Sequence, residues 1–395
     1  MMKNGKIGKG NFHVLCYAIC IFLFAIGHTK IQNISFITGV SVTYGKFIPL
    51  ILSAVILLGT VKYNTRTIVV FGLLVMLLMY SFLCNDLSYV IFFVAYFMLA
   101  CSNSEETEIY KSYTYVVLSV VFLTVVLALV GLLENDNSWY GRYDLGFTYC
   151  TFGPNLFLSA CLTMVAWKKD KMRIRDWLLV LLMNQFLYWK TNTDAVYISV
   201  LAIFVLWILI RNKKIYKFML NNKVIGFFFS HIFSIFAVLT IVFQSYYNSH
   251  YMNSHMVLLN KILSNRLIMG RNVFLQYGPD VGNIVKEVVF GLGVDKVSYL
   301  DSSYLALLTS YGLPLLVVFC YLMDYISRKS LKQGELFITL CLFVFAVHCV
   351  TDPQLSSFRA NPFIITSLLY IRKGKRLESK QIMDRRIKMM LQKVE

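Results

Sequence analysis

Hydrophobic residues along this chain gather into long apolar runs that recur from near the N-terminus to Tyr370. Many of the runs hold 16–22 residues. An α-helix needs about 20 apolar residues to cross a hydrocarbon layer of about 30 Å. The pattern predicts an all-α polytopic integral membrane protein with about 12 transmembrane helices, at approximately 11–28, 47–61, 68–84, 88–101, 113–133, 152–167, 177–189, 195–210, 224–244, 302–324, 335–351 and 361–371.

Composition agrees with this pattern, because 58% of the residues are hydrophobic and only 15% are charged. Soluble domains carry about 25% charged residues. We expect a single membrane domain over residues 1–395, with one long extracytoplasmic loop at 245–300 between spans nine and ten. A basic cytoplasmic tail would follow at 372–395.

The distribution of charge predicts the orientation of the helices. If the N-terminus is cytoplasmic, 28 of the 38 Lys and Arg residues lie on the cytoplasmic side, and the formal charge of +18 lies there as well. Cytoplasmic loops of membrane proteins are enriched in Lys and Arg in this way. The basic runs adjoin membrane spans, so lipid headgroups explain them better than nucleic acid does, and we expect no nucleic-acid partner.

The predicted outer face carries four arginines, Arg142, Arg266, Arg271 and Arg359. A guanidinium group matches the planar oxygens of phosphate and stays charged, so such arginines suit a lipid diphosphate at the membrane surface. The alternative is that each one reaches the interface or pairs with a carboxylate. The sequence alone leaves both interpretations of these arginines open.

The long loop contains a candidate amphipathic helix, MVLLNKILSNRLIMGRNVF, at 256–274. At 100° per residue, Arg271 shares one face with Asn260 and other polar residues, whereas Arg266 falls at the centre of the apolar stripe. A charge in apolar surroundings is costly without a partner. We therefore expect Arg266 to contact an anion and Arg271 to be solvated, unless Gly270 breaks the helix.

Few groups on the outer side could accept a proton. His348 lies at the end of the eleventh span, four residues before Asp352, and Asp301 opens the tenth span. A histidine oriented by a carboxylate one turn away can act as a general base. The alternative is a histidine at a helix end with a capping aspartate. No cluster of ligands predicts a metal site and no phosphate-binding glycine-rich loop occurs, so we expect no metal and no cofactor.

Four stretches resemble the Wzy-type repeat-unit polymerases of O-antigen, capsule and exopolysaccharide, which share an architecture with the O-antigen ligases. These stretches are RYDLGFTYCTFGPN before the sixth span, LSNRL in the long loop, FGLGV with LDSSYLALLTSYGLP before and into the tenth span, and HCVTDPQLSSFRANPF after the eleventh. Arg142–Gly153 and Arg271–Gly282 also match the family's Arg-x10-Gly spacing. Asp194 stands where relatives often carry an arginine.

The resemblance implies a metal-independent membrane glycosyltransferase of the bacterial plasma membrane, with both termini cytoplasmic. It would polymerise oligosaccharide repeat units linked to undecaprenyl diphosphate, on the outer face. Its partners would be that lipid-linked oligosaccharide, membrane lipids, and a chain-length regulator and flippase of the same pathway.

The implied roles extend to individual residues. His348, Asp352 or Asp301 would act in catalysis, and the residues that bind substrate would be Arg142, Arg266, Arg271, Arg359, Asn155 and Tyr304. Asn155 would also satisfy backbone groups freed by the Gly-Pro turn at the start of the sixth span. Two alternatives stay open: a ligase-like transferase with another acceptor, and a flippase or transporter, for which broken helices and ionisable residues within the spans are typical.

Overall fold

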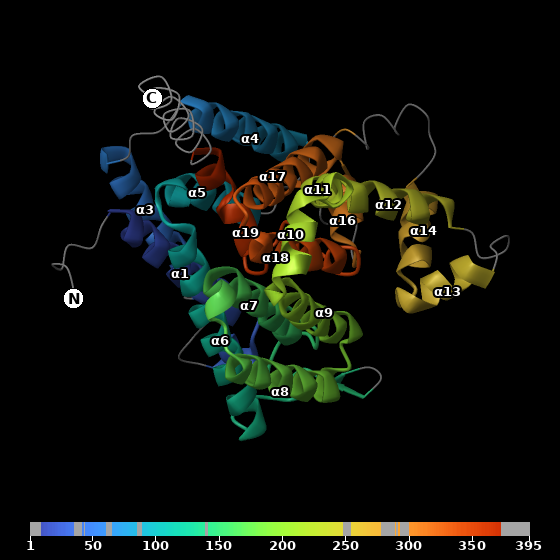
Figure 1. Cartoon of the computed structure of the whole chain (residues 1–395). Helices are drawn as coiled ribbons and strands as arrows, with labels where there is room; N and C mark the ends of the chain where they lie inside the picture. Colours follow the sequence, from blue (N-terminus) through green and yellow to red (C-terminus); the bar gives the residue numbers. More distant parts are fainter. Residues whose placement is uncertain are drawn as a thin grey trace.

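The computed structural model describes residues 9–34, 42, 44–60, 65–84, 89–138, 141–247, 254–277, 289, 291–292 and 300–372. This part of the chain is mostly helical, which confirms the all-α prediction (Figure 1). The strands β1 (Asn137–Ser138) and β2 (Arg142–Tyr143) form one short antiparallel pair. Most of the predicted tail and parts of the loop at 245–300 lie outside the described residues.

The α-helices follow the apolar runs closely in the first half of the chain and less closely in the second. Their bounds are α1 (Lys9–Ile26), α3 (Phe47–Thr60), α4 (Thr65–Cys84), α5 (Tyr89–Ala100), α6 (Glu106–Leu129), α7 (Phe152–Lys168), α8 (Ile174–Thr191), α9 (Asp194–Arg211), α10 (Lys213–Asn221), α11 (Lys223–Ser230), α12 (Ile232–Tyr246), α13 (Ser254–Ile262), α14 (Arg266–Tyr277), α16 (Ser303–Tyr311), α17 (Leu313–Lys332), α18 (Leu336–His348) and α19 (Pro362–Ile365).

Helices α7 and α18 form the centre of the protein. Every residue from Gly153 to Ala166 is buried, and α18 is buried along nearly its whole length. A helix that is apolar on all sides belongs inside a bundle. Small residues let neighbours approach α7: a side chain on Gly153 would come within 2.6 Å of the Phe147 ring. The N-terminal end of α7 therefore packs tightly against the loop that precedes it.

The number of membrane spans differs from the prediction of about 12. Among the described helices, α6 and α9 are each long and apolar enough to cross a membrane, and α11 with α12 makes a third if the bent pair counts as one span. Several predicted spans are short or interrupted. Helix α18 has 13 residues, and Gly312, with φ of 86°, separates α16 from α17 within the predicted tenth span.

The predicted ninth span, 224–244, is bent by 69° between α11 and α12, at His231. The bend frees the first backbone N–H groups of α12, which need an acceptor where water is excluded. Asp324 of α17 supplies it: its carboxylate accepts from the Phe233 amide at 2.8 Å and from the Ser234 amide at 3.2 Å. The hydroxyl of Ser234 donates to the same carboxylate at 2.6 Å.

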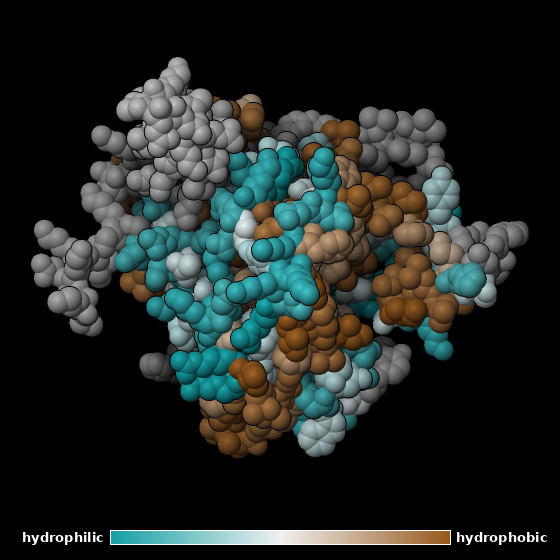
Figure 2. All heavy atoms as spheres, in the orientation of Figure 1, coloured by the Kyte–Doolittle hydropathy of each residue, from teal (hydrophilic) through white to brown (hydrophobic). Residues whose placement is uncertain are grey.

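Large apolar side chains are exposed on many of the helices (Figure 2). Leu58 is 89% exposed, Val224 78%, Ile174 76% and Trp189 73%. Soluble proteins rarely expose apolar surface on this scale, whereas helices in contact with lipid must. The exposed faces agree with association of the protein with a membrane.

Candidate functional site

Arg266 lies at the first position of α14, directly after a break in the long loop. The predicted helix at 256–274 is interrupted at Ser264 and Asn265, whose φ angles are 51° and 66°, and not at Gly270. The prediction of one continuous helix was therefore wrong. The side chain of Asn260 stabilises the break, because its Oδ1 accepts from the Leu267 and Ile268 amides at 3.1 and 3.2 Å.

The Arg266 guanidinium connects three separate segments. Its Nε donates to the Thr351 carbonyl oxygen at 2.7 Å, and its Nη1 lies 3.4 Å from the Leu263 carbonyl oxygen. Its Nη2 lies 3.2 Å from a carboxylate oxygen of Asp301, whose side chain is 45% exposed. The expected anion is present within the chain, so this structure alone favours the carboxylate-pairing alternative for Arg266.

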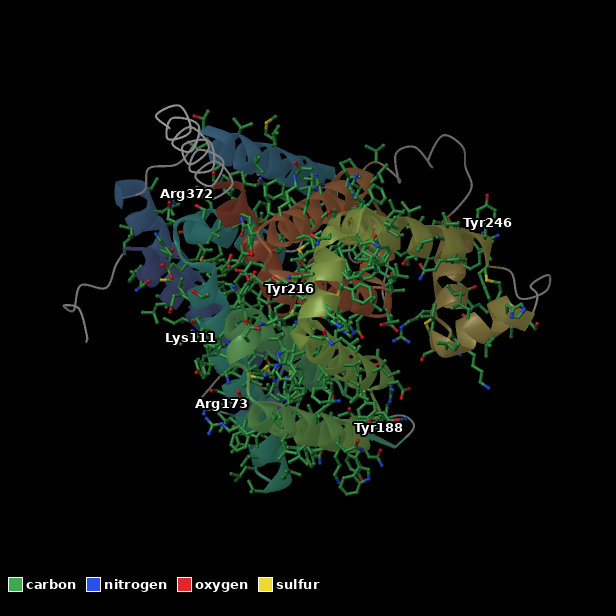
Figure 3. The ribbon with its side chains drawn as sticks, in the orientation of Figure 1. Lys111, Arg173, Tyr188, Tyr216, Tyr246 and Arg372 are labelled. Atoms are coloured by element: carbon green, nitrogen blue, oxygen red, sulfur yellow. The ribbon has the colours of Figure 1, made fainter. Side chains whose placement is uncertain are left out.

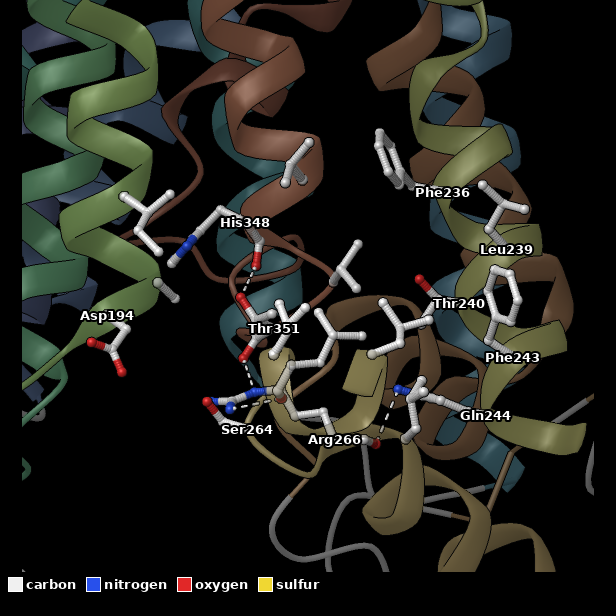
Figure 4. Close-up of a pocket in the computed structure, with 18 of the residues that line it drawn as sticks. Asp194, Phe236, Leu239, Thr240, Phe243, Gln244, Ser264, Arg266, His348 and Thr351 are labelled. Atoms are coloured by element: carbon white, nitrogen blue, oxygen red, sulfur yellow. Dashed lines mark hydrogen bonds between the residues drawn. The ribbon is translucent and has the colours of Figure 1, made fainter. Parts of the chain in front are cut away.

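A cavity of about 390 Å³ extends from Arg266 between α9, α12, α18 and the α13–α14 segment (Figure 4). Apolar side chains form most of its walls, and the polar ones include Asp194, Arg266, His348 and Thr351. Most binding sites for small molecules have such apolar walls and few polar groups. This cavity suits a ligand with an apolar body and an anionic end near Arg266.

His348 reaches the wall of this cavity from the end of α18. Its Nε2 lies 3.0 Å from Oδ1 of Asn155, and Nδ2 of Asn155 donates to Oδ1 of Asp352 at 3.0 Å. The predicted pair is present as well, since Nε2 of His348 lies 3.7 Å from Oδ2 of Asp352. The better hydrogen bond, however, passes through Asn155, whose side chain bridges the pair and does not cap backbone groups as predicted.

This chain of hydrogen bonds selects one tautomer of His348. Asn155 must present its amide nitrogen to the Asp352 carboxylate, because its oxygen there would face another acceptor. Its oxygen therefore faces His348, so Nε2 of His348 carries the proton. Nδ1 is left with a lone pair, and it is buried without a hydrogen-bond partner among the described residues. A neutral histidine with a free lone pair can accept a proton.

The pKa of Asp352 leads to a stability prediction. Burial raises the pKa of this carboxyl from 3.8 to about 6, against smaller lowering by Arg266, Asn155 and Gln354. A raised pKa means that the contribution to stability is full below about pH 4 and is lost as the pH rises through about 6.

Asp352→Asn should therefore flatten the dependence of the unfolding temperature on pH over that window. Above neutral pH, the variant should gain on the order of 3 kcal/mol, because it no longer holds a buried charge. Thermal unfolding of the purified full-length protein between pH 4 and 8 measures this. Asp170→Asn, at an exposed position, is the control. An unchanged pH dependence in Asp352→Asn would contradict the assignment.

Arg142 lies in β2, and its Nη2 donates to the Asn192 carbonyl oxygen at 2.5 Å. Asn192 belongs to the turn between α8 and α9, two residues before Asp194, which lines the cavity. The structure therefore places Arg142 against the turn that leads to the cavity wall. Arg142 is absent from the residues that line the cavity.

Arg271 has a different role from the predicted one. It is half-buried, and its Nη1 donates to the Ser245 carbonyl oxygen at 2.5 Å. This contact joins α14 to the end of α12, so Arg271 is not a solvated surface residue. Gly282, its partner in the Arg-x10-Gly spacing, lies outside the described residues.

The remaining two predicted binding residues lie away from the cavity. Tyr304 is fully buried, and its hydroxyl donates to the Ala346 carbonyl oxygen at 2.9 Å, which joins α16 to α18. Arg359 donates to Nε2 of His28 and lies over the Phe152 ring, with its Cζ 4.7 Å from the ring centre. Neither residue lines the cavity at Arg266.

Comparisons of the chain with protein-family models, with curated proteins and with solved structures found no match. The functional argument therefore depends on the site itself. Two of its residues, Thr351 and Asn260, were not predicted from the sequence. Thr351 acts through its backbone carbonyl group, which leaves no signal in the sequence. Asn260 was assigned to the polar face of a helix, although its side chain is buried.

Proposed function

We propose that this protein is a polytopic membrane glycosyltransferase that joins oligosaccharide repeat units carried on undecaprenyl diphosphate. One observation carries the proposal: an apolar cavity has Arg266 at one end and the side chain of His348 in its wall. A polyprenyl diphosphate has the matching form, an apolar chain with a dianionic end. The cavity would take the part of the lipid next to the diphosphate.

The residues of the site can divide the reaction between them. Nδ1 of His348 is buried in this structure and would have to become accessible to the acceptor sugar. It would then take the proton from a hydroxyl group of that sugar, and the oxygen would attack the anomeric carbon of the donor. The bond between that carbon and the diphosphate oxygen breaks, and its electron pair leaves with undecaprenyl diphosphate. Arg266 would stabilise the negative charge that develops on the leaving group. Asp301, now paired with Arg266, would be displaced by the diphosphate.

The proposal is tested by reconstitution. The full-length protein in vesicles, supplied with a repeat unit linked to undecaprenyl diphosphate, should form a ladder of longer lipid-linked glycans and release undecaprenyl diphosphate. A ligase-like enzyme would transfer glycan to another acceptor without forming a ladder. If no undecaprenyl diphosphate is released from the lipid-linked donor, glycosyl transfer is contradicted.

The broken helix α11–α12 favours one other function, transport. A second cavity, of about 300 Å³, lies at the break and is lined by His231, Asp324 and Arg328, among others. Broken helices with ionisable residues are typical of transporters. The carboxylate of Asp324, however, is occupied by three hydrogen bonds to the first turn of α12. That occupancy fits a structural cap better than an ion-coupling site. In the reconstituted vesicles, movement of the lipid-linked unit between leaflets without glycan elongation would support transport.

The proposal includes a cytoplasmic N-terminus and the membrane orientation predicted from the distribution of Lys and Arg. Figure 3 shows Lys111, Arg173 and Arg372 on the left of the molecule, Tyr216 near its centre, and Tyr188 and Tyr246 on the right. Reporter fusions test the orientation.

A reporter fused after Lys171 should behave as cytoplasmic and one fused after Lys261 as extracytoplasmic, because 28 of 38 basic residues fall on one side. Identical behaviour of the two fusions would contradict this topology. An alkaline phosphatase reporter, active only outside the cytoplasm, and a fluorescent protein, active only inside it, give opposite signals for each position.

A further inference from the structure

Two basic side chains, Lys46 and Arg359, lie close together in a part of the protein separate from the cavity at Arg266. Lys46 is only 5% exposed, although it precedes α3 at the predicted outer surface. Arg359 is half-buried in the segment that joins α18 to α19. The two are connected through Phe24 and His28: Lys46 lies over the Phe24 ring, His28 donates to the Phe24 carbonyl oxygen, and Arg359 donates to His28.

Both cations have only uncharged partners in the described part of the chain. Nζ of Lys46 lies 4.4 Å from the centre of the Phe24 ring. Arg359 lies over the Phe152 ring and donates to Nε2 of His28. His28 must be neutral to accept this bond, and its Nδ1 lies 3.0 Å from the Phe24 carbonyl oxygen, to which it donates.

Among the described residues, this arrangement leaves the two positive charges without a carboxylate partner. Aromatic faces attract cations but offset only part of the cost of burying them. Burial lowers the pKa of Arg359 to about 10 from 12.5, the direction expected for a cation in apolar surroundings, and the group stays charged at neutral pH. Buried charges in proteins are paired, or else they bind an ion of opposite charge.

We propose that Lys46 and Arg359 form a second site for a phosphate group, distinct from the one at Arg266. The segment 349–361 connects the two: its Thr351 accepts from Arg266 at 2.7 Å, and Arg359 lies at its other end. Asn155 and Ser159 of α7 hold this segment, since Asn155 donates to Asp352 and Ser159 donates to the Ala360 carbonyl oxygen at 2.8 Å. His348 therefore lies beside a segment that contacts Arg266 at one end and carries Arg359 at the other.

On the proposed function, the second site holds the diphosphate of the second lipid-linked substrate. Joining two lipid-linked units requires two anionic headgroups at the outer surface, and the same base must reach the acceptor that one of them carries. Several lipids carry a phosphate group that could bind here. We assign the site to the diphosphate of the acceptor substrate.

Native mass spectrometry of the purified full-length protein tests the proposal, with undecaprenyl diphosphate, phosphatidylglycerol and inorganic diphosphate as separate probes. The wild type should bind two molecules of undecaprenyl diphosphate. Lys46→Met and Arg359→Gln should each weaken one binding event at least tenfold, and Arg266→Gln should weaken the other. Lys261→Met, at an exposed position of α13, is the matched control and should bind two.

The variants distinguish this proposal from the proposed function. If one molecule binds and only Arg266→Gln removes it, the second site is wrong and the cavity remains. If one molecule binds and only Lys46→Met or Arg359→Gln removes it, the second site stands and the cavity fails as a diphosphate site. Binding of phosphatidylglycerol at Lys46 and Arg359 as tightly as of undecaprenyl diphosphate would support a phosphate site and overturn its assignment to the acceptor. Tight binding of inorganic diphosphate alone would overturn the requirement for a lipid.

Folding is monitored independently. Lys46→Met removes a buried charge without a carboxylate partner and keeps the volume of the side chain, so the unfolding temperature should stay the same or rise. A lower unfolding temperature for Lys46→Met, together with unchanged lipid binding, would show a structural lysine and overturn the proposal.

Discussion

Arg266→Gln should strongly slow polymer formation while the protein remains folded in the membrane. Loss of a charge-assisted contact to the leaving diphosphate should cost about 2–4 kcal/mol of transition-state stabilisation, which lowers the rate roughly 30- to 1000-fold. Arg266→Lys should recover little of the wild-type rate, because an ammonium group cannot make the paired hydrogen bonds of a guanidinium. Turnover of the reconstituted protein, with lipid-linked single units as substrate, measures the effect.

Arg271→Gln is the matched control for Arg266→Gln, since both arginines belong to α14 and lie five residues apart. Arg271 donates to Ser245 and lies outside the cavity lining, so its loss should weaken the packing of α14 on α12. We expect a cost of about 1–2 kcal/mol in stability and a turnover close to that of the wild type. If turnover instead fell more for Arg271→Gln than for Arg266→Gln at equal amounts of folded protein, the cavity would not be the diphosphate site.

His348→Gln should lower the rate of glycosyl transfer about 10²- to 10⁴-fold, the range that general base catalysis contributes. Glutamine can keep a hydrogen bond to Asn155 but offers no lone pair of comparable basicity. The expected loss lies in kcat, with the KM for the lipid-linked donor nearly unchanged, because His348 would act on the acceptor hydroxyl. The measurement is steady-state kinetics over a range of donor concentrations.

Asn155→Ala separates a positioning role from a catalytic one. The variant keeps His348 but removes the acceptor for its Nε2 proton, so either tautomer becomes accessible. We expect a smaller loss than in His348→Gln, together with a change in the dependence of kcat on pH. A higher KM with an unchanged kcat, or a loss of folded protein alone, would show that the His348–Asn155–Asp352 chain is structural.

The sequence determined the helical class, because apolar runs of 16–22 residues are too long for ordinary strands and have the length of helices that cross a membrane. It also led to Arg266, although the continuous helix on which that argument depended is broken just before this residue. It placed His348 beside Asp352, because residues four apart lie one turn apart at a helix end. The structure confirms that contact, at 3.7 Å.

Only the tertiary structure decided the rest, because the deciding contacts join residues far apart in the chain. Asn155 and His348 are 193 positions apart in the chain, so the local sequence pattern around either residue cannot predict their contact. The break at Ser264 and Asn265 depends on the buried side chain of Asn260, which the helical pattern had assigned to a polar face. The bend between α11 and α12 likewise depends on Asp324, about 90 residues later in the chain. Apolar content predicts where helices form, whereas these long-range polar contacts decide where they stop and which charged groups meet.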